Sequence, residues 1–144
     1  MIKREWITKV TISFLLLFLG AFIYAIFRQD VLFCSWIPFE ILARMKIDIS
    51  YQDCHWIIYW VVFCLPDALW YASQIVIQTV LHKEKMTSWL LGFTLLLPFI
   101  YEIMQAINLV PGTFDWLDVF TYLLTLIVVM LCQKNYLLSY ISYR

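Results

Sequence analysis

Val10 to Phe27 is an unbroken run of 18 residues without a charged side chain, and it restricts the possible folds more than any other feature of the chain. At 1.5 Å per residue, a helix of this length spans about 27 Å, close to the thickness of a bilayer's hydrocarbon core. Lys9 precedes the run and Arg28 follows it. The run exceeds the apolar core of a secretory signal peptide and no cleavage-site pattern follows, so we expect a retained signal-anchor helix.

The composition of the whole chain points to lipid as its solvent. Of 144 residues, 64% are hydrophobic and only 14% are charged, and the mean hydropathy is +0.83. Soluble chains are about half apolar and about a quarter charged, so a soluble domain of this length cannot bury so much apolar surface. A net charge of zero provides no basic surface for nucleic acid. We predict a single all-α membrane domain over residues 1–144, with membrane lipid as its partner and no nucleic acid.

Apolar stretches predict four transmembrane helices, over approximately residues 10–27, 56–81, 86–109 and 117–133. Lys and Arg are enriched in cytoplasmic loops. Seven of the ten lie before the first stretch, between the second and third, or after the fourth, whereas the last outer connection has no cation. We therefore expect a multi-pass protein of the cytoplasmic (inner) membrane with both termini in the cytoplasm. The sequence specifies no oligomeric state.

The connection between the first two stretches is too long and too apolar for a bare loop. Within it, Ile37, Ile41 and Met45 recur at helical spacing behind Pro38, a residue suited to a first helical turn. We expect a short helix that lies in the outer membrane interface.

Cysteine and histidine spacing gives no metal motif. Cys34 and Cys54 fall on the outer side, where an oxidising compartment would allow a disulfide; the alternative is two unpaired cysteines acting as small apolar residues. His55 and His82 are expected on opposite sides of the membrane, and no zinc-type Cys/His spacing is present. We predict no metal site and no cofactor.

Polar side chains recur on one face of each later helix, and we call this set the polar seam. An ionised side chain in hydrocarbon costs about 2.5 kcal/mol or more, so such a face must turn away from lipid. The spacing of three and four residues places each group on one helical face. The seam consists of Asp67, Tyr71, Gln74 and Gln78 in the second stretch, Glu102 and Gln105 in the third, and Asp115, Asp118, Tyr122 and Thr125 at the fourth.

Each acidic residue of the seam also has a structural interpretation. Asp115 follows a Pro111-Gly112 turn, where it is placed to cap the fourth helix while Asp118 complements the helix dipole. Glu102 and Asp67 are equally suited to hydrogen bonds that hold neighbouring helices together.

Two segments have a recognisable spacing: Tyr101-Glu102-Ile103-Met104-Gln105, and then Pro111-Gly112-Thr113-Phe114-Asp115-Trp116-Leu117-Asp118. They resemble the VanZ-like family of small bacterial membrane proteins, in which Glu-x-x-Gln lies near the end of one span and Asp-x-x-Asp opens the next. The resemblance covers roughly residues 55–130, including the Pro66-Asp67 interruption. The family's Arg before the first Asp is missing here, and Thr121-Tyr122 replaces its Asn-Gly. The family is named after a member linked to glycopeptide resistance, and the resemblance implies membership more than a defined reaction.

We expect the seam to form a site in the outer leaflet that binds or acts on an envelope lipid or an amphiphilic antibiotic. Catalytic candidates are Glu102, Asp115 and Asp118; substrate-binding candidates are Asp67, Tyr71, Gln74 and Gln105. Crowded carboxylates in a low-dielectric site cannot all be ionised, so one would serve as a general acid, or a pair would bind a divalent cation. A separation of Asp67 and Glu102 by more than about 15 Å would remove this hypothesis, because it exceeds hydrogen-bond reach.

Two other functions fit the same residues. In a non-enzymatic interaction or immunity-type protein, the seam would only fix helix packing. In a proton-coupled efflux protein, an intramembrane acid such as Glu102 would exchange protons for a cationic compound.

Overall fold

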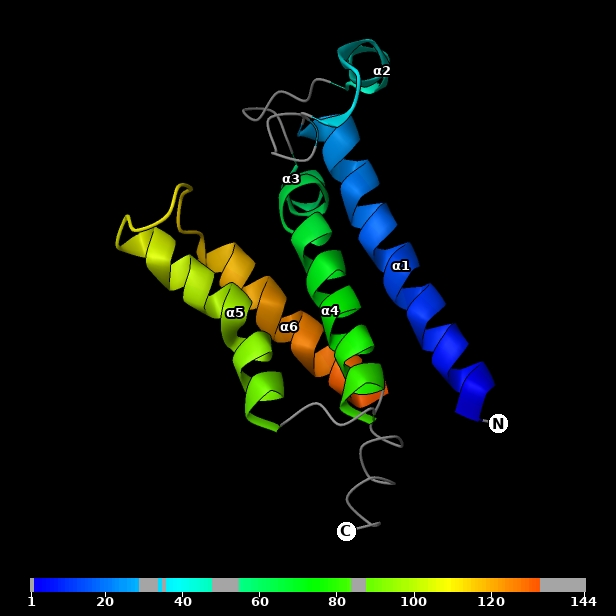
Figure 1. The fold of residues 1–144 in the computed structure, drawn as a ribbon. Helices are drawn as coiled ribbons and strands as arrows, with labels where there is room; N and C mark the ends of the chain where they lie inside the picture. The colour runs from blue at the N-terminus through cyan, green and yellow to red at the C-terminus, as the bar shows by residue number, and fades with distance from the viewer. Residues whose placement is uncertain (1, 29–33, 35, 48–54, 84–87, 133–144) are drawn as a thin grey trace.

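The computed structural model describes residues 2–28, 34, 36–47, 55–83 and 88–132, and the regular structure in these ranges is helical, with no strand (Figure 1). In chain order the helices are α1 (Ile2–Phe27), α2 (Phe39–Met45), α3 (Trp56–Phe63), α4 (Leu65–Lys83), α5 (Ser88–Ala106) and α6 (Trp116–Cys132). The prediction of an all-α fold is confirmed. The first helix begins eight residues earlier than the predicted stretch, while α6 differs from its predicted bounds by one residue at each end.

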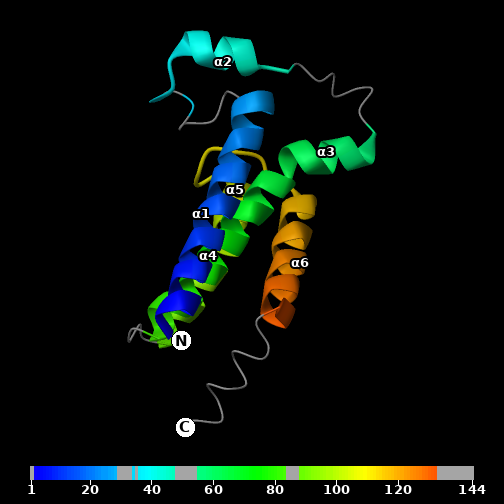
Figure 2. The same cartoon turned by 90° about the vertical axis from the view of Figure 1, so that its right-hand side faces the viewer.

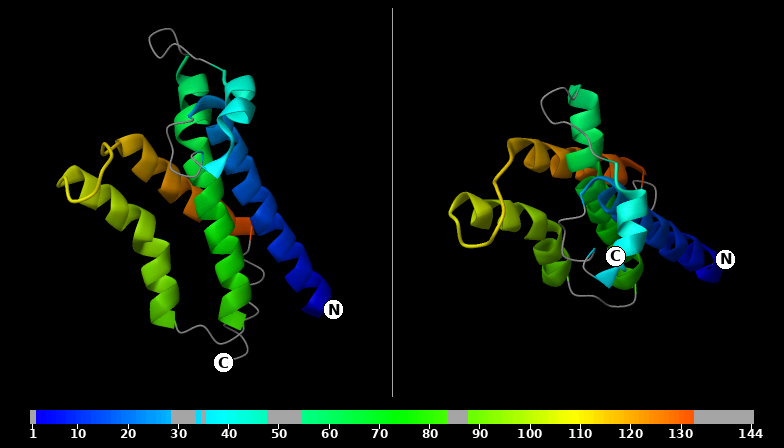
Figure 3. Two further views of the ribbon diagram at one scale, coloured as in Figure 1. Left: turned by 45° about the horizontal axis from the view of Figure 1, so that its top comes forward. Right: turned by 90° about the horizontal axis from the view of Figure 1, so that it is seen from above.

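The four long helices alternate in direction (Figures 1 and 2). The N-terminal ends of α1 and α5 lie on the same side as the C-terminal ends of α4 and α6, and α2 and α3 lie on the other side. Helix α4 packs against α1, α5 and α6, and the views in Figure 3 place it between α1 and α5. The polar side chains of the seam on α4 therefore have a neighbouring helix on either side.

The second predicted stretch is two helices rather than one. Helices α3 and α4 meet at Cys64 with a bend of 44°. The cause is Pro66, which has no backbone N–H to donate to the preceding turn and whose ring excludes a regular helix there. Normal bonding resumes at Ala68, whose N–H donates to the carbonyl oxygen of Cys64 at 3.0 Å.

One described helix, α1, is long and apolar enough by itself to cross a membrane, with a mean hydropathy of 2.5 in its apolar part, Trp6–Phe27. The bent α3–α4 pair meets the same criterion when counted as one span, and α5 and α6 contain shorter apolar stretches. Large apolar side chains nevertheless face outward on the helices, as in Phe18 (67% exposed), Ile103 (59%) and Leu131 (65%). Such a surface suits apolar surroundings.

The short helix expected after the first stretch is present as α2, with Pro38 at its N-cap position. It is attached to the end of α1 by a small cluster in which Cys34 and Leu42 are buried against Ala25. Cys54 and residues 84–87 lie outside the described residues. The choice between a Cys34–Cys54 disulfide and two unpaired cysteines therefore stays open, and the connection before α5 stays a prediction.

Small residues let α1 and α4 approach closely, as is common between helices in membranes. Ser13 and Ser73 are buried and share a hydrogen bond of 2.8 Å between their hydroxyl oxygens, and Ser73 Oγ also donates to the carbonyl oxygen of Ser13 at 2.8 Å. Nearby, Gly20 leaves space for the indole of Trp70, whose Nε1 donates to the carbonyl oxygen of Leu17 at 3.1 Å.

Gly20→Ala is expected to destabilise the α1–α4 pair by about 1–3 kcal/mol, because the added Cβ would overlap the Trp70 indole and lie 3.0 Å from the carbonyl oxygen of Pro66. Gly92→Ala is the matched control, since a Cβ there meets nothing within 4 Å and gains about 1 kcal/mol of helix propensity. Unfolding by denaturant in detergent micelles measures both. Equal stabilities for the two variants would contradict this account of the packing.

Candidate functional site

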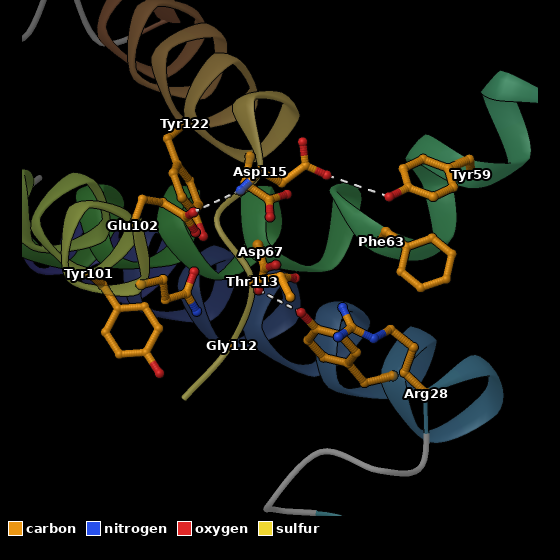
Figure 4. A pocket seen from close by; sticks show the side chains of 13 residues that line it. Arg28, Tyr59, Phe63, Asp67, Tyr101, Glu102, Gly112, Thr113, Asp115 and Tyr122 are labelled. Carbon is orange, nitrogen blue, oxygen red and sulfur yellow. Dashed lines mark hydrogen bonds between the residues drawn. The ribbon is translucent and has the colours of Figure 1, made fainter. Parts of the chain in front are cut away.

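One cavity of about 320 Å³ lies where the C-terminal ends of α1, α3 and α5 meet the N-terminal ends of α4 and α6. We call it the acidic cavity. Its lining includes five of the seven residues proposed from the sequence: Asp67, Glu102, Gln105, Asp115 and Asp118. Asp67 and Glu102 thus face the same cavity, and their charges interact. Figure 4 shows Asp67, Glu102 and Asp115 converging from three elements.

Asp67 lies at the start of α4 because the helix restarts directly after the break at Cys64. Its Oδ1 accepts a hydrogen bond of 2.6 Å from the hydroxyl of Tyr24, a residue of α1 that is 5% exposed. A hydroxyl donor of this kind stabilises a carboxylate that has been removed from water. The bond also ties the end of α1 to the start of α4.

The N-terminus of α6 gathers two further carboxylates. Asp115 Oδ1 accepts from the backbone N–H of Leu117 at 2.8 Å, so the predicted capping role of Asp115 is confirmed. Its Oδ2 accepts from the hydroxyl of Tyr59 on α3 at 3.5 Å. Glu102, only 4% exposed, accepts from the backbone N–H of Asp115 through Oε2 at 3.4 Å. The free N–H groups and the dipole of the helix therefore support both acids.

Asp118 lies in the first turn of α6 and lines the cavity beside the helix break. The fully buried Cys64 lies near its carboxylate. The indole Nε1 of Trp60, on α3, donates to Thr121 Oγ1 on α6 at 3.0 Å. These contacts fix α3 across the start of α6, so the break and the acidic cavity belong to one structural unit.

The turn between α5 and α6 depends on a glycine. Gly112 has φ 132°, and a Cβ there would overlap the side-chain amide of Gln105. Only glycine combines this backbone conformation with so close a neighbour. The predicted Pro111-Gly112 turn therefore brings Gln105 and Asp115 to the same cavity.

Arg28 is the charged residue of this site that the sequence did not indicate. It follows the last residue of α1 and lines the cavity, where its guanidinium lies 5.2 Å from the ring centroids of both Tyr24 and Phe63. Cation–π contacts of this kind hold a guanidinium in place. As the flanking charge of an apolar run, it gave no signal in sequence that distinguishes it from an ordinary boundary residue. The other lining residues not proposed are mostly aromatic or in the turn: Tyr24, Tyr59, Phe63, Tyr101, Gly112, Thr113 and Tyr122.

Tyr71 and Gln74, two of the proposed binding residues, do not line the cavity. Gln74 Nε2 donates to the carbonyl oxygen of Thr94 at 2.6 Å, and the Tyr71 hydroxyl donates to that of Leu95 at 2.8 Å. Pro98 explains the first contact, because it has no N–H to donate to Thr94 within α5. These two residues of the seam join α4 to α5.

Within the ranges that the structure describes, no three His, Cys, Asp or Glu side chains are grouped so that they could hold a metal ion. Comparison with models of protein families, with curated proteins and with solved structures gave no match. The function is therefore argued from the chemistry of the acidic cavity itself.

Tyr24→Phe is expected to lower the free energy of unfolding by about 1–3 kcal/mol, because Asp67 would lose a buried hydrogen-bond donor. Tyr101→Phe serves as the control, since the Tyr101 side chain is 48% exposed and its hydroxyl makes only a 3.5 Å contact with the carbonyl oxygen of Pro111. Denaturant unfolding in micelles measures the difference. An unfolding midpoint of Tyr24→Phe equal to that of Tyr101→Phe would show that the bond to Asp67 contributes nothing.

Proposed function

We propose that this chain is a four-span protein of the cytoplasmic membrane, of VanZ-like type, that binds or acts on an envelope lipid or an amphiphilic antibiotic in the acidic cavity. The observation that carries the proposal is the convergence of four carboxylates, from α4, α5 and the start of α6, on one cavity. Their mutual repulsion and lost hydration oppose folding, so helix packing alone gives no reason to gather them.

The four spans of the proposal are α1, the bent α3–α4 pair, α5 and α6. Their outward-facing apolar side chains support this assignment. Helices α5 and α6 have 19 and 17 residues, which is toward the lower end of the span-length range and suits a crossing with little tilt.

Charge supports an orientation with the acidic cavity outside. Arg4 and Lys9 lie in the N-terminal part of α1, and Lys83 ends α4 on the same side of the bundle. The enrichment of Lys and Arg on cytoplasmic sides assigns this end to the cytoplasm. The cavity, at the other end, would then open within the outer leaflet, where a lipid head group or the polar part of an amphiphile can enter it.

The acids have different parts in this proposal. Asp115 is occupied by capping α6 and by the Tyr59 hydroxyl, so its main role is to position the helix. Glu102 and Asp118 are the better candidates for moving a proton as general acid or base, and Asp67, Gln105 and Arg28 for holding the ligand. No cofactor is needed for these roles.

A packing role is supported for the other half of the polar seam. The side chains of Tyr71 and Gln74 donate hydrogen bonds to backbone carbonyl oxygens of α5. A non-enzymatic interaction protein would use the acids in the same way, so the two functions are separated by testing whether the acids affect ligand binding or only abundance.

The four-span topology predicts opposite accessibilities for Thr113 and Lys83. In a cysteine-free background, Thr113→Cys is expected to react with a membrane-impermeant maleimide in intact cells, because it lies in the outer α5–α6 turn. Lys83→Cys is expected to react only after the membrane is permeabilised. Labelling of both sites in intact cells, or of neither before permeabilisation, would contradict the topology.

Glu102→Gln and Asp118→Asn are each expected to weaken ligand binding by about tenfold, because they remove a charged hydrogen-bonding partner while keeping side-chain size. Calorimetry of the detergent-solubilised chain with a short-chain phospholipid and with a lipid-tailed glycopeptide measures the affinity. Glu40→Gln, at an exposed position on α2, is the matched control. Abundance in the membrane should match the wild type; a loss of abundance with unchanged affinity would favour the packing role instead.

A further inference from the structure

Negative charges outnumber positive charges in the lining of the acidic cavity, and the two kinds of charge come from different helices. Four carboxylates come from α4, α5 and the start of α6, while Arg28, at the end of α1, is the one cation among the described lining residues. The four carboxylates attract a cationic group, while the guanidinium at the opposite wall attracts an anionic group. A ligand that matches both must carry both charges.

The α5 wall of the cavity presents acceptors without donors. Glu102 is 4% exposed, and its only hydrogen bond with a described residue is the 3.4 Å contact from the N–H of Asp115 to Oε2. Its second carboxylate oxygen therefore accepts from no described residue. Gln105 Oε1 is buried and has no described partner. A buried acceptor is normally satisfied, so this one at a cavity indicates a ligand that brings a hydrogen-bond donor, and the neighbouring Glu102 carboxylate favours a charged donor.

The α1 wall presents hydrogen-bond donors, on Arg28, that lack an anionic acceptor within the part of the chain that the structure describes. The guanidinium of Arg28 lies over the rings of Tyr24 and Phe63, and among the described residues its charge acts on Asp67 and Asp118 without a direct ion pair. Its planar array of donors matches a phosphate or a carboxylate. Figure 4 shows Arg28 approaching the cavity from α1, on the side away from Glu102.

The N-terminus of α6 does not supply an alternative anion site. Asp115 takes the N–H of Leu117, and Glu102 takes the N–H of Asp115. Because carboxylates of the protein already occupy these donors, an anionic group of the ligand has Arg28 as its partner.

From this complementarity we infer that the acidic cavity takes a zwitterionic head group with a primary ammonium and a phosphate, as in phosphatidylethanolamine. The ammonium lies against Glu102 and Gln105, whose acceptors need N–H donors, and the phosphate lies against Arg28. A quaternary ammonium such as choline has no N–H to donate and fits less well. This inference rests on the proposed function, since it specifies the ligand of the same cavity.

The test is calorimetric titration of the full chain in maltoside micelles with dioctanoyl phosphatidylethanolamine, phosphatidylcholine and phosphatidylglycerol. Phosphatidylethanolamine is expected to bind about tenfold more tightly than either of the others. Glu102→Gln should remove its advantage over phosphatidylcholine, and Arg28→Gln should weaken all three phospholipids. Glu40→Gln and Arg44→Gln make the same chemical changes at exposed positions of α2 and should change nothing. Circular dichroism and gel filtration establish that each variant is folded.

Competition with free phosphoethanolamine distinguishes a soluble ligand from a lipid that carries the same head group. If it displaces phosphatidylethanolamine at equal concentration, the head-group assignment is supported and the natural ligand is a soluble compound; if it does not, the acyl chains contribute and the ligand is a lipid. Equal binding of all three phospholipids would overturn the inference and leave the proposed function standing. The absence of binding by any amphiphile, including a lipid-tailed glycopeptide, would overturn both.

Discussion

The break at Cys64 is the feature on which the rest of this structure depends. A proline two residues later cannot complete the helix, so α3 turns away by 44° and α4 begins again with Asp67 in its first turn. The turn lets α3 lie across the start of α6, where Tyr59 and Trp60 make their hydrogen bonds. Without the break, α3 would continue along α4 and the acidic cavity would lose one wall.

Electrostatics then decides how the acids are tolerated. Three of the carboxylates accept hydrogen bonds from neutral donors: a tyrosine hydroxyl for Asp67, a tyrosine hydroxyl and a backbone N–H for Asp115, and a backbone N–H for Glu102. Asp118 lies near the thiol of Cys64. None of these donors is a cation. The protein thus supports the acids while leaving their charge available to a ligand, whereas direct ion pairs would have neutralised it.

The sequence predicted the faces of the helices better than the functions of the residues on them. Spacing by three and four placed Asp67, Tyr71 and Gln74 on one side of α4, which is where the structure has them in contact with other helices. The spacing could not distinguish Asp67, which lines the cavity, from Tyr71 and Gln74, which do not. A helical face runs the full length of α4, whereas the cavity lies only at the beginning of α4. Arg28 was missed for a related reason: its partners are aromatic rings distant in sequence or one turn earlier, and periodicity does not register such contacts.

Pro98 and Gln74 together make the folding of α5 depend on its packing against α4. In hydrocarbon, a backbone carbonyl without a donor is too costly to leave bare. The Thr94 carbonyl lacks its helical donor because residue 98 is proline, and the amide that replaces it belongs to α4. In a bilayer, α5 by itself would be an incomplete helix. In the proposed four-span topology, α4 would enter the membrane before α5 because it precedes α5 in the chain, so the order of synthesis would supply the missing donor in time.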